Sequence, residues 1–227
     1  MKVLFVINPK SGRQLQELIE RLIAKEIKEL EYEYKLYKME GKDEKSRIAK
    51  EIKSYKPEIV AATGGDGTVN LLAQLLANTD IKLLIVPAGS ANGMAKELGI
   101  GGRIDFALSL LKNGIIRKID LLRINGKICI HLADVGLNAR IVKRFEQDKK
   151  RGIVTYAKHL LGEVFLIKQY RFYIVYDEIE IARKAVSLTF ANASKYGTGA
   201  VINPFGIIDD GKFELVIVKP FPRIKLL

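Results

Sequence analysis

We expect the chain to be organised around the stretch Pro57–Leu76, PEIVAATGGDGTVNLLAQLL. An apolar, partly β-branched run over residues 59–62 stops at Thr63 and meets the turn GGDGT at 64–68. Valine and leucine then recur at helical spacing as far as Leu76. This pattern is typical of a buried strand, a tight turn and a helix. We therefore expect one strand–turn–helix unit centred on residues 64–68.

The glycines Gly64, Gly65 and Gly67 suggest a turn that needs positive φ or that lets a bulky group approach closely. A polyanion suits such a turn, because the N–H groups and the dipole of a helix N-terminus favour negative charge. Asp66 beside a phosphate requires a divalent cation between them, so we interpret it as a Mg²⁺ carboxylate for a nucleotide. A glycine-rich connection without chemistry is the alternative that this segment alone leaves open.

Two further apolar runs end in small polar or glycine-rich loops that lead into helices. Val3–Ile7 precedes Asn8–Arg13, NPKSGR, and Leu83–Val86 precedes Pro87–Gly93, PAGSANG. Such loops gather at the carboxyl ends of the strands in an open parallel sheet, where ligands bind. We therefore expect the N-terminal half to be a doubly wound α/β domain with a mostly parallel sheet. NPKSG is also ordinary turn chemistry, which remains an alternative for that loop.

The pattern changes at about residue 119, where strand-like runs joined by turns replace alternating strands and helices. Asn125-Gly126 is a strong hairpin signal. We expect a nucleotide-binding domain over 1–118 and a mainly antiparallel β domain over 119–227, with a helical insert at about 152–169. The expected strands of the second domain are 120–124, 127–132, 172–176, 179–181, 185–192 and 213–218.

Composition indicates a folded, basic protein. The chain has 227 residues, 48% of them hydrophobic, and Lys plus Arg minus Asp plus Glu is 38 − 26, a net charge of +12. This charge favours nucleic acid, an anionic membrane or an anionic substrate. The chain has no Trp, and its Tyr and Phe are scattered along strand-like runs without forming a base-stacking platform. We therefore do not expect a nucleic-acid partner.

The single cysteine, Cys129, excludes an intramolecular disulfide and suits a reducing cytoplasm. The sequence has no signal-peptide h-region and no apolar run of ~20 residues, so we expect a cytoplasmic protein whose membrane contact is peripheral. Seven cations over 140–158, followed by apolar residues, suit an anionic membrane surface. The alternative is that the apolar face packs on the β domain and the cations are solvated. The sequence leaves the oligomeric state open, a homodimer included.

Several motifs together resemble the diacylglycerol kinase catalytic-domain family, which includes bacterial lipid kinases and the sphingosine and ceramide kinases. Their order and spacing agree over nearly the whole chain, which is more specific than any motif alone. The motifs are NPKSGR at 8–13, GGDGTVN at 64–70, PAGSANGMA at 87–95, GLNARIV at 136–142 and INPFGIIDDGKFEL at 202–215.

The resemblance implies a two-domain, ATP-dependent lipid kinase with a β-sandwich-like C-terminal domain. Asp66 corresponds to the family's Mg²⁺-linked aspartate, and we expect it to be the catalytic residue. Cations such as Lys10 would offset phosphate charge. The expected nucleotide contacts are Asn8, Lys10, Ser11, Gly12, Gly64, Gly65, Asp66, Gly67, Thr68, Asn70, Gly89, Ser90 and Asn92.

The resemblance also implies a second, structural Mg²⁺ in the loop 207–212. The Asp210 carboxylate and the carbonyls of Ile207 and Lys212 would be its ligands, and oxygen ligands suit a hard cation. The alternative for this DDG sequence is a plain hairpin turn.

The chain also departs from the family pattern. Leu71 stands where Glu is common, Gly93 where Asp is common, and no nucleotide-contacting Thr is visible near Met39. The family's proposed general base is a Glu in a D-G-E turn, and the sequence reaches Leu227 before such a turn. We expect either a truncated product or a chain without that base, for which Asp134 and Asp210 are substitute candidates.

We therefore expect an ATP- and Mg²⁺-dependent kinase that phosphorylates a hydroxyl of a diacylglycerol- or sphingoid-like lipid. A first alternative is an NAD kinase-like enzyme, which shares GGDGT and a related two-domain plan. A second alternative is a non-catalytic homologue that binds a nucleotide or a lipid.

Overall fold

The computed structural model describes residues 1–9, 13–147 and 168–220. Its contacts divide the chain into two units: Met1–His131 with Lys195–Ala200, and Leu132–Ser194 with Val201–Leu227. The expected helical insert lies outside the described residues except for Lys168 and Gln169, which are not helical. The boundary expected near residue 118 stays a prediction.

The first unit contains a parallel sheet of four strands in the order β2-β1-β3-β4. The strands are β1 (Lys2–Ile7), β2 (Glu33–Lys38), β3 (Ile59–Gly64) and β4 (Lys82–Pro87). Ile7 pairs with Thr63, and Thr63 pairs with Val86. The carboxyl ends of β1, β3 and β4 are therefore level, and the loops that follow them begin at one edge of the sheet.

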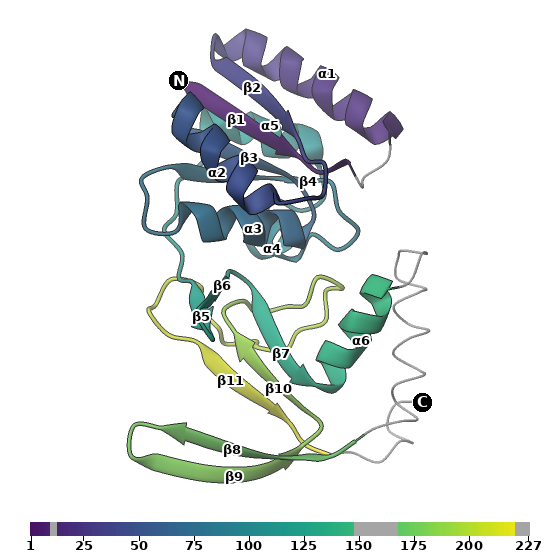
Figure 1. Cartoon of the computed structure of the whole chain (residues 1–227), viewed down its shortest axis with the longest axis vertical. Coiled ribbons are helices and arrows are strands. Elements are labelled where there is room, and N and C mark those ends of the chain that lie inside the picture. The colour runs from purple at the N-terminus through teal and green to yellow at the C-terminus, as the bar shows by residue number, and fades with distance from the viewer. Residues whose placement is uncertain (10–12, 148–167, 221–227) are drawn as a thin grey trace. The chain divides into compact units, whose positions relative to one another are not determined.

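Helices cover both faces of this sheet, as Figure 1 shows. α1 (Arg13–Leu30) and α5 (Ile104–Asn113) pack together on one face. α2 (Glu44–Tyr55) and α3 (Asp66–Leu76) pack against each other, and the short helix α4 (Gly93–Glu97) contacts α3 and β4. This arrangement confirms the doubly wound α/β fold expected from the sequence.

The continuous apolar runs form the core of the first unit because both faces of the sheet are covered. No residue of Val3–Ile7 is more than 1% exposed. Side chains alternate between the faces of a strand, so Val3, Phe5 and Ile7 share one face and Leu4 the other. The first face packs on Ile19, Ile23 and Ile27 of α1 and on Ala107, Leu108 and Leu111 of α5.

The hairpin signal at Asn125-Gly126 is confirmed. β5 (Leu122–Ile124) and β6 (Lys127–Cys129) pair antiparallel, and φ is 50° at Asn125 and 76° at Gly126. Two consecutive residues with positive φ are the signature of the type I′ turn, whose twist matches that of the paired strands. This hairpin belongs to the first unit.

The second unit is built from antiparallel strands, which confirms the expected class of the C-terminal half. β7 (Leu132–Gly136), β10 (Ser187–Ala191) and β11 (Glu214–Val218) form one sheet in the order β11-β10-β7. β8 (Tyr170–Tyr176) and β9 (Ile179–Ala185) form a separate two-stranded ladder.

Two features of the chain after residue 119 differ from the sequence prediction. Residues 127–132 are not one strand, because β6 ends at Cys129 and β7 begins at Leu132 in another sheet. An apolar run carries no mark of the place where a chain changes sheets. The helix α6 (Leu137–Gln147) was not predicted; its Leu137 and Ile141 pack on Val186.

Within the described residues, no helix is both long enough and apolar enough to cross a bilayer.

Candidate functional site

The loops after β1, β3 and β4 meet at the carboxyl edge of the parallel sheet. The N–H of Asn8 donates to the carbonyl of Thr63 at 2.9 Å, and the N–H of Ala88 donates to the carbonyl of Gly64 at 3.0 Å. These bonds continue the pairing of the strands by one residue on each side of β3. The turn 64–68 therefore lies between the other two loops, as the sequence predicted for a parallel sheet.

The glycines of these loops serve close approach. None of Gly64, Gly65, Gly67 and Gly89 has positive φ. A Cβ at Gly89 would lie 2.4 Å from the Cα of Gly65, and one at Gly64 would lie 2.5 Å from the Oγ1 of Thr68. A Cβ at Gly67 would meet nothing within 4 Å. Positive φ is therefore not the reason for these glycines. Gly64 and Gly89 leave room for neighbouring loop atoms, Gly67 does not, and the approach of a bulky group stays a prediction.

Two of the residues that we expect to contact the nucleotide, Asn8 and Asn92, form side-chain hydrogen bonds that stabilise the loops. The Nδ2 of Asn8 donates to the Oγ1 of Thr68 at 3.0 Å, which ties the end of β1 to the first turn of α3. The side chain of Asn92 bonds Gly89 twice, accepting from its N–H and donating to its carbonyl, both at 2.9 Å. Asn92 itself has φ 53° and ψ 49°, a left-handed conformation that Asn tolerates well.

Asp66 is the first residue of α3 and is half-buried. Its Oδ1 accepts a hydrogen bond from the N–H of Met94 at 3.1 Å. Its Oδ2 accepts none from the described residues, and a Cβ at Gly197 would lie 3.4 Å from it. The first N–H groups of a helix have no partner within the helix and carry partial positive charge. Asp66 therefore offers an open carboxylate oxygen beside an anion-favouring helix end.

Thr63 supplies an independent polar feature at this edge. Its side chain is fully buried, and its Oγ1 has no hydrogen-bond partner among the described residues. A buried hydroxyl without a partner costs about 1–3 kcal/mol and calls for an explanation. A polar atom of a ligand or a water molecule would satisfy it.

The remaining residues that we expect to contact the nucleotide are Asn70, Ser90 and residues 10–12. The Oδ1 of Asn70 accepts from the N–H of Ile130 at 3.1 Å, so this side chain joins α3 to the residue after β6. Ser90 is exposed in the loop after β4. Lys10, Ser11 and Gly12 lie outside the described residues, and their contacts stay predictions.

The loop expected to hold a second Mg²⁺ belongs to the second unit. The Oδ1 of Asp210 accepts from the N–H of Lys212 at 3.0 Å, and Ile207, Asp210 and Lys212 are exposed. The described ranges of the chain contain no group of three or more His, Cys, Asp or Glu side chains that could hold a metal. A metal at this loop would therefore depend on backbone carbonyls, and it stays a prediction.

The β2–α2 loop lies beyond the carboxyl end of β2 and is organised by Glu44, which is 9% exposed. Its Oε1 accepts from the N–H groups of Glu40 and Gly41, and its Oε2 accepts from the hydroxyl of Tyr37 at 3.0 Å. Burial, and then this hydrogen bond, raise the pKa of Tyr37. The Arg47 guanidinium, bonded to the Glu40 carboxylate, lowers the pKa of Glu40. Sequence reasoning did not single out this loop.

Sequence reasoning also missed a contact from residues far along the chain. The Nζ of Lys96 in α4 donates to the carbonyl of Gly197 at 2.7 Å, in the segment Lys195–Ala200 that the contacts assign to the first unit. Two glycines in the sequence KYGTGA were the available signal.

Gly93 explains one departure from the family pattern. A Cβ at Gly93 would lie 2.5 Å from the Cε1 of His131 and 3.1 Å from the Cα of Gly197. The imidazole of His131 therefore occupies the space that an Asp side chain would need at position 93.

Comparison with known proteins matches both halves of the chain. Residues 2–124 match the family model described as the diacylglycerol kinase catalytic domain, and residues 132–227 match the YegS C-terminal NAD kinase beta sandwich-like domain. The chain is 31% identical over 178 residues to a diacylglycerol kinase of Mycobacterium tuberculosis, covering 75% of this chain and 58% of that protein. It is 28% identical over 224 residues to a diacylglycerol kinase of Bacillus subtilis, with coverages of 94% and 72%.

A solved structure of a diacylglycerol kinase from Bacillus anthracis shares the fold. It superposes with a TM-score of 0.77 at 21% identity, covering 99% of this chain and 76% of that one. The chain spans 51% to 61% of the length of three of the curated relatives that it matches.

Proposed function

Because the chain belongs to the diacylglycerol kinase catalytic domain family, we propose that it transfers the terminal phosphate of ATP to the hydroxyl of a lipid, with Mg²⁺ as the metal. The observation that carries this proposal is Asp66, whose Oδ2 is open beside the N-terminus of α3. The nucleotide phosphates and the metal would lie at the carboxyl edge of β1, β3 and β4.

The residues at this edge fit such a ligand. A carboxylate is a hard oxygen donor of the kind that Mg²⁺ prefers, and the metal is usually held by one or two carboxylates together with substrate phosphates. The contact between Gly65 and Gly89 leaves no side chain over the backbone, which suits close approach of phosphate. The hydroxyl of Thr63 is a buried polar group in need of a partner.

The protein has a limited chemical task in phosphoryl transfer. The transition state is loose, so catalysis comes chiefly from positioning and from neutralising charge on the phosphate oxygens. Mg²⁺, when bound, would supply most of that charge. Asp66 would hold the metal, the N–H groups at the start of α3 would orient the phosphate, and the bonds from Asn8 and Asn92 would keep the loops in place.

The lipid acceptor is supported by the names of the relatives, which are lipid or diacylglycerol kinases. A diacylglycerol- or sphingoid-like alcohol is our proposed substrate class. Peripheral contact with an anionic membrane is part of the proposal, supported by the net charge of +12. Part of the cationic segment 140–158 lies outside the described residues.

A transfer assay tests this function. Purified protein would be incubated with labelled ATP and Mg²⁺, with vesicles containing diacylglycerol or sphingosine, and in a separate reaction with NAD. We expect label in one of the lipids and none in NAD, and we expect Asp66→Asn to lower the rate of lipid labelling about 10²–10³-fold. Label in NAD alone would favour the NAD kinase-like alternative. The second matching domain model is described as NAD kinase beta sandwich-like, so this alternative is tested in the same assay. Binding of Mg-ATP without any labelled product would favour the non-catalytic alternative.

A further inference from the structure

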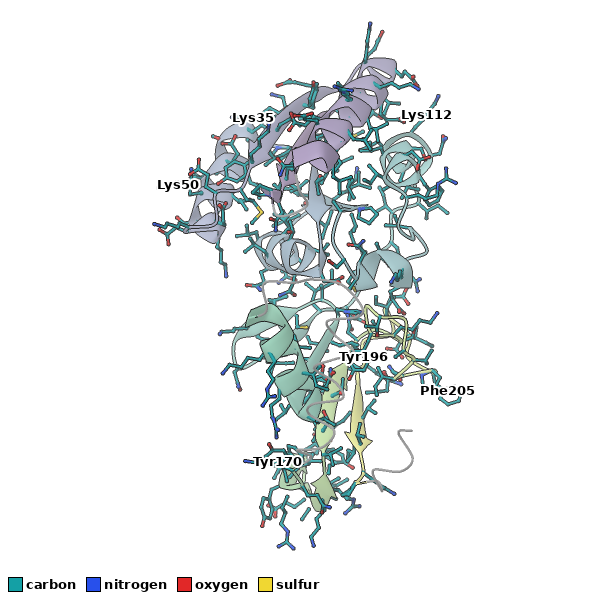
Figure 2. The ribbon with its side chains drawn as sticks, turned by 90° about the vertical axis from the view of Figure 1, so that its right-hand side faces the viewer. Lys35, Lys50, Lys112, Tyr170, Tyr196 and Phe205 are labelled. Carbon is teal, nitrogen blue, oxygen red and sulfur yellow. The ribbon has the colours of Figure 1, made fainter. Side chains whose placement is uncertain are left out.

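The segment Lys195–Ala200 is separated from the rest of the first unit by more than sixty residues of sequence, yet its contacts place it there. Both of its neighbours along the chain, Ser194 and Val201, belong to the second unit. Between these two residues, the chain therefore contributes six residues to the first unit. Figure 2 labels Tyr196 within this segment.

The segment packs on the residues that surround Asp66. A Cβ at Gly197 would lie 2.6 Å from the Cβ of Ala91 and 3.4 Å from the Oδ2 of Asp66. The N–H of Met94, close to Ala91 in sequence, holds the Oδ1 of the same carboxylate. One oxygen of Asp66 is thus bonded by the start of α4, and the other faces the backbone of Gly197.

Internal bonds give the segment a defined turn. The N–H of Tyr196 donates to the carbonyl of Ala200 at 2.9 Å, and the N–H of Gly199 donates to the carbonyl of Tyr196 at 2.8 Å. Gly199 has φ of 93°, a conformation that L side chains rarely adopt. This turn, Lys195–Ala200, is called the glycine turn below.

The side chain of Lys96 joins α4 to the glycine turn by a hydrogen bond from its Nζ to the carbonyl of Gly197. A lysine ammonium has three donors and a long flexible stem, so one bond to a carbonyl leaves two donors available. A charged donor makes a stronger bond than a neutral one, although exposure of Lys96 weakens it.

We infer that the glycine turn forms a further wall of the proposed phosphate site, beside the loops after β1, β3 and β4, and that Lys96 is a positioning residue that holds this turn against Asp66. This inference rests on the proposed function. Gly197 lies against the carboxylate that would hold the metal, and no side chain there separates backbone from ligand. Lys96 acts through the turn: its ammonium fixes the carbonyl of Gly197, and the turn then limits where a phosphate can lie.

The test uses Lys96→Met, which keeps an unbranched side chain of similar length and removes the donor, and Lys96→Arg, which keeps a charged donor. Lys112→Met is the matched control, because Lys112 is an exposed lysine of α5 (Figure 2) and its loss changes the net charge equally. Amide hydrogen exchange of Tyr196 and Gly199 would be measured with and without Mg-ATP. The amide of Met94 serves as an internal reference.

We expect Lys96→Met to speed exchange at Tyr196 and Gly199 about three- to tenfold and to leave Met94 unchanged. Mg-ATP should slow exchange at the two turn amides in the wild type and in Lys96→Arg, and not in Lys96→Met. In the lipid assay, kcat should fall about three- to tenfold in Lys96→Met with KM for the lipid unchanged, and Lys96→Arg should restore it. Lys112→Met should match the wild type throughout.

Unchanged exchange in Lys96→Met, or an absence of protection by Mg-ATP at a concentration shown to saturate the protein, would overturn the inference and leave the proposed function intact. A wild-type protein that binds no Mg-ATP would instead overturn the proposed function, and with it the role inferred for the glycine turn. Protection and binding without lipid phosphorylation would support the wall while favouring a non-catalytic protein.

Discussion

The helices α2 and α3, which pack beside the same parallel sheet, each begin with an acidic residue. The two carboxylates differ in their burial and in the number of hydrogen bonds that they accept. Glu44 is 9% exposed, and both of its oxygens accept bonds from its own strand and loop. Asp66 is half-buried, accepts one bond from a different loop, and keeps its Oδ2 open among the described residues.

The comparison separates a structural acid from a functional candidate. Glu44 has its acceptor capacity taken up by two N–H groups and a hydroxyl, so it stabilises the loop and has little left for a ligand. The N–H of Met94 orients the Asp66 carboxylate, whose remaining acceptor capacity is open to a ligand. An acidic residue at the start of a helix therefore indicates a ligand site only when its hydrogen-bond partners leave an oxygen open.

The largest expected effect is the loss of activity in Asp66→Asn. The substitution removes the charge that would hold Mg²⁺, so kcat/KM for lipid phosphorylation should fall about 10²–10³-fold. The free energy of unfolding should change by less than about 0.5 kcal/mol, because the Oδ1 of Asn still accepts from Met94. Steady-state kinetics and urea unfolding measure the two quantities.

Asp80→Asn is the matched control for this change, since Asp80 is exposed in the loop before β4. Equal losses of activity in the two variants would show that charge alone matters and would remove the distinction drawn for Asp66.

Glu44→Ala should lower the stability of the protein and leave its activity nearly unchanged. It leaves the N–H groups of Glu40 and Gly41 without their acceptor, so stability should fall by about 2 kcal/mol. The kcat of the folded fraction should stay within about twofold of the wild type. Urea unfolding checks the first expectation against Glu29→Ala, an exposed position of α1. A collapse of kcat in folded Glu44→Ala would mean that the β2–α2 loop serves catalysis directly.

Two glycines of the site sharpen the comparison further. Gly89→Ala would bring a Cβ to 2.4 Å from the Cα of Gly65 and 2.8 Å from the Oδ1 of Asn92, and should cost about 1–2 kcal/mol of stability together with affinity for Mg-ATP. Gly67→Ala meets nothing within 4 Å, lies in α3, and should stabilise the protein by about 0.5 kcal/mol. Thermal or urea unfolding of the pair decides the matter, and equal stabilities would contradict the close packing of the two loops.

The smallest effect concerns the pH dependence of Tyr37. Its pKa is raised above the ordinary value of 10.0 by burial and by Glu44. Below pH 10 the phenol is protonated in both states and the contribution is complete. As pH rises, the unfolded chain loses the proton first, so stability falls until the pH passes the native pKa.

Tyr37→Phe should therefore lower stability by about 1 kcal/mol at neutral pH and remove part of the decline above pH 10. Unfolding curves between pH 8 and 11 would measure this difference. Parallel pH profiles for the two proteins would show that the phenol titrates alike in the native and unfolded states.

The sequence predicted β1, β3 and β4 because their signals are local. Val3–Ile7, Ile59–Ala62 and Leu83–Val86 are uninterrupted apolar runs, and a strand buried on both faces requires such runs. The helix α6 was not predicted although its amphipathic pattern is also local, so this signal was available. The break between β6 and β7 gave no signal at all.

For the candidate site, the sequence determined which residue types follow the ends of β1, β3 and β4, and therefore which loops meet at one edge. The roles of these residues depend on long-range contacts: Asn8 and Asn92 bond within and between the loops, Asn70 accepts from Ile130, and Asp66 keeps an open oxygen. The tertiary structure also brought Gly197 beside Asp66. The reason is physical: periodicity and turn chemistry are set by neighbours along the chain, whereas the partner of a hydrogen bond is set by packing between segments far apart in sequence.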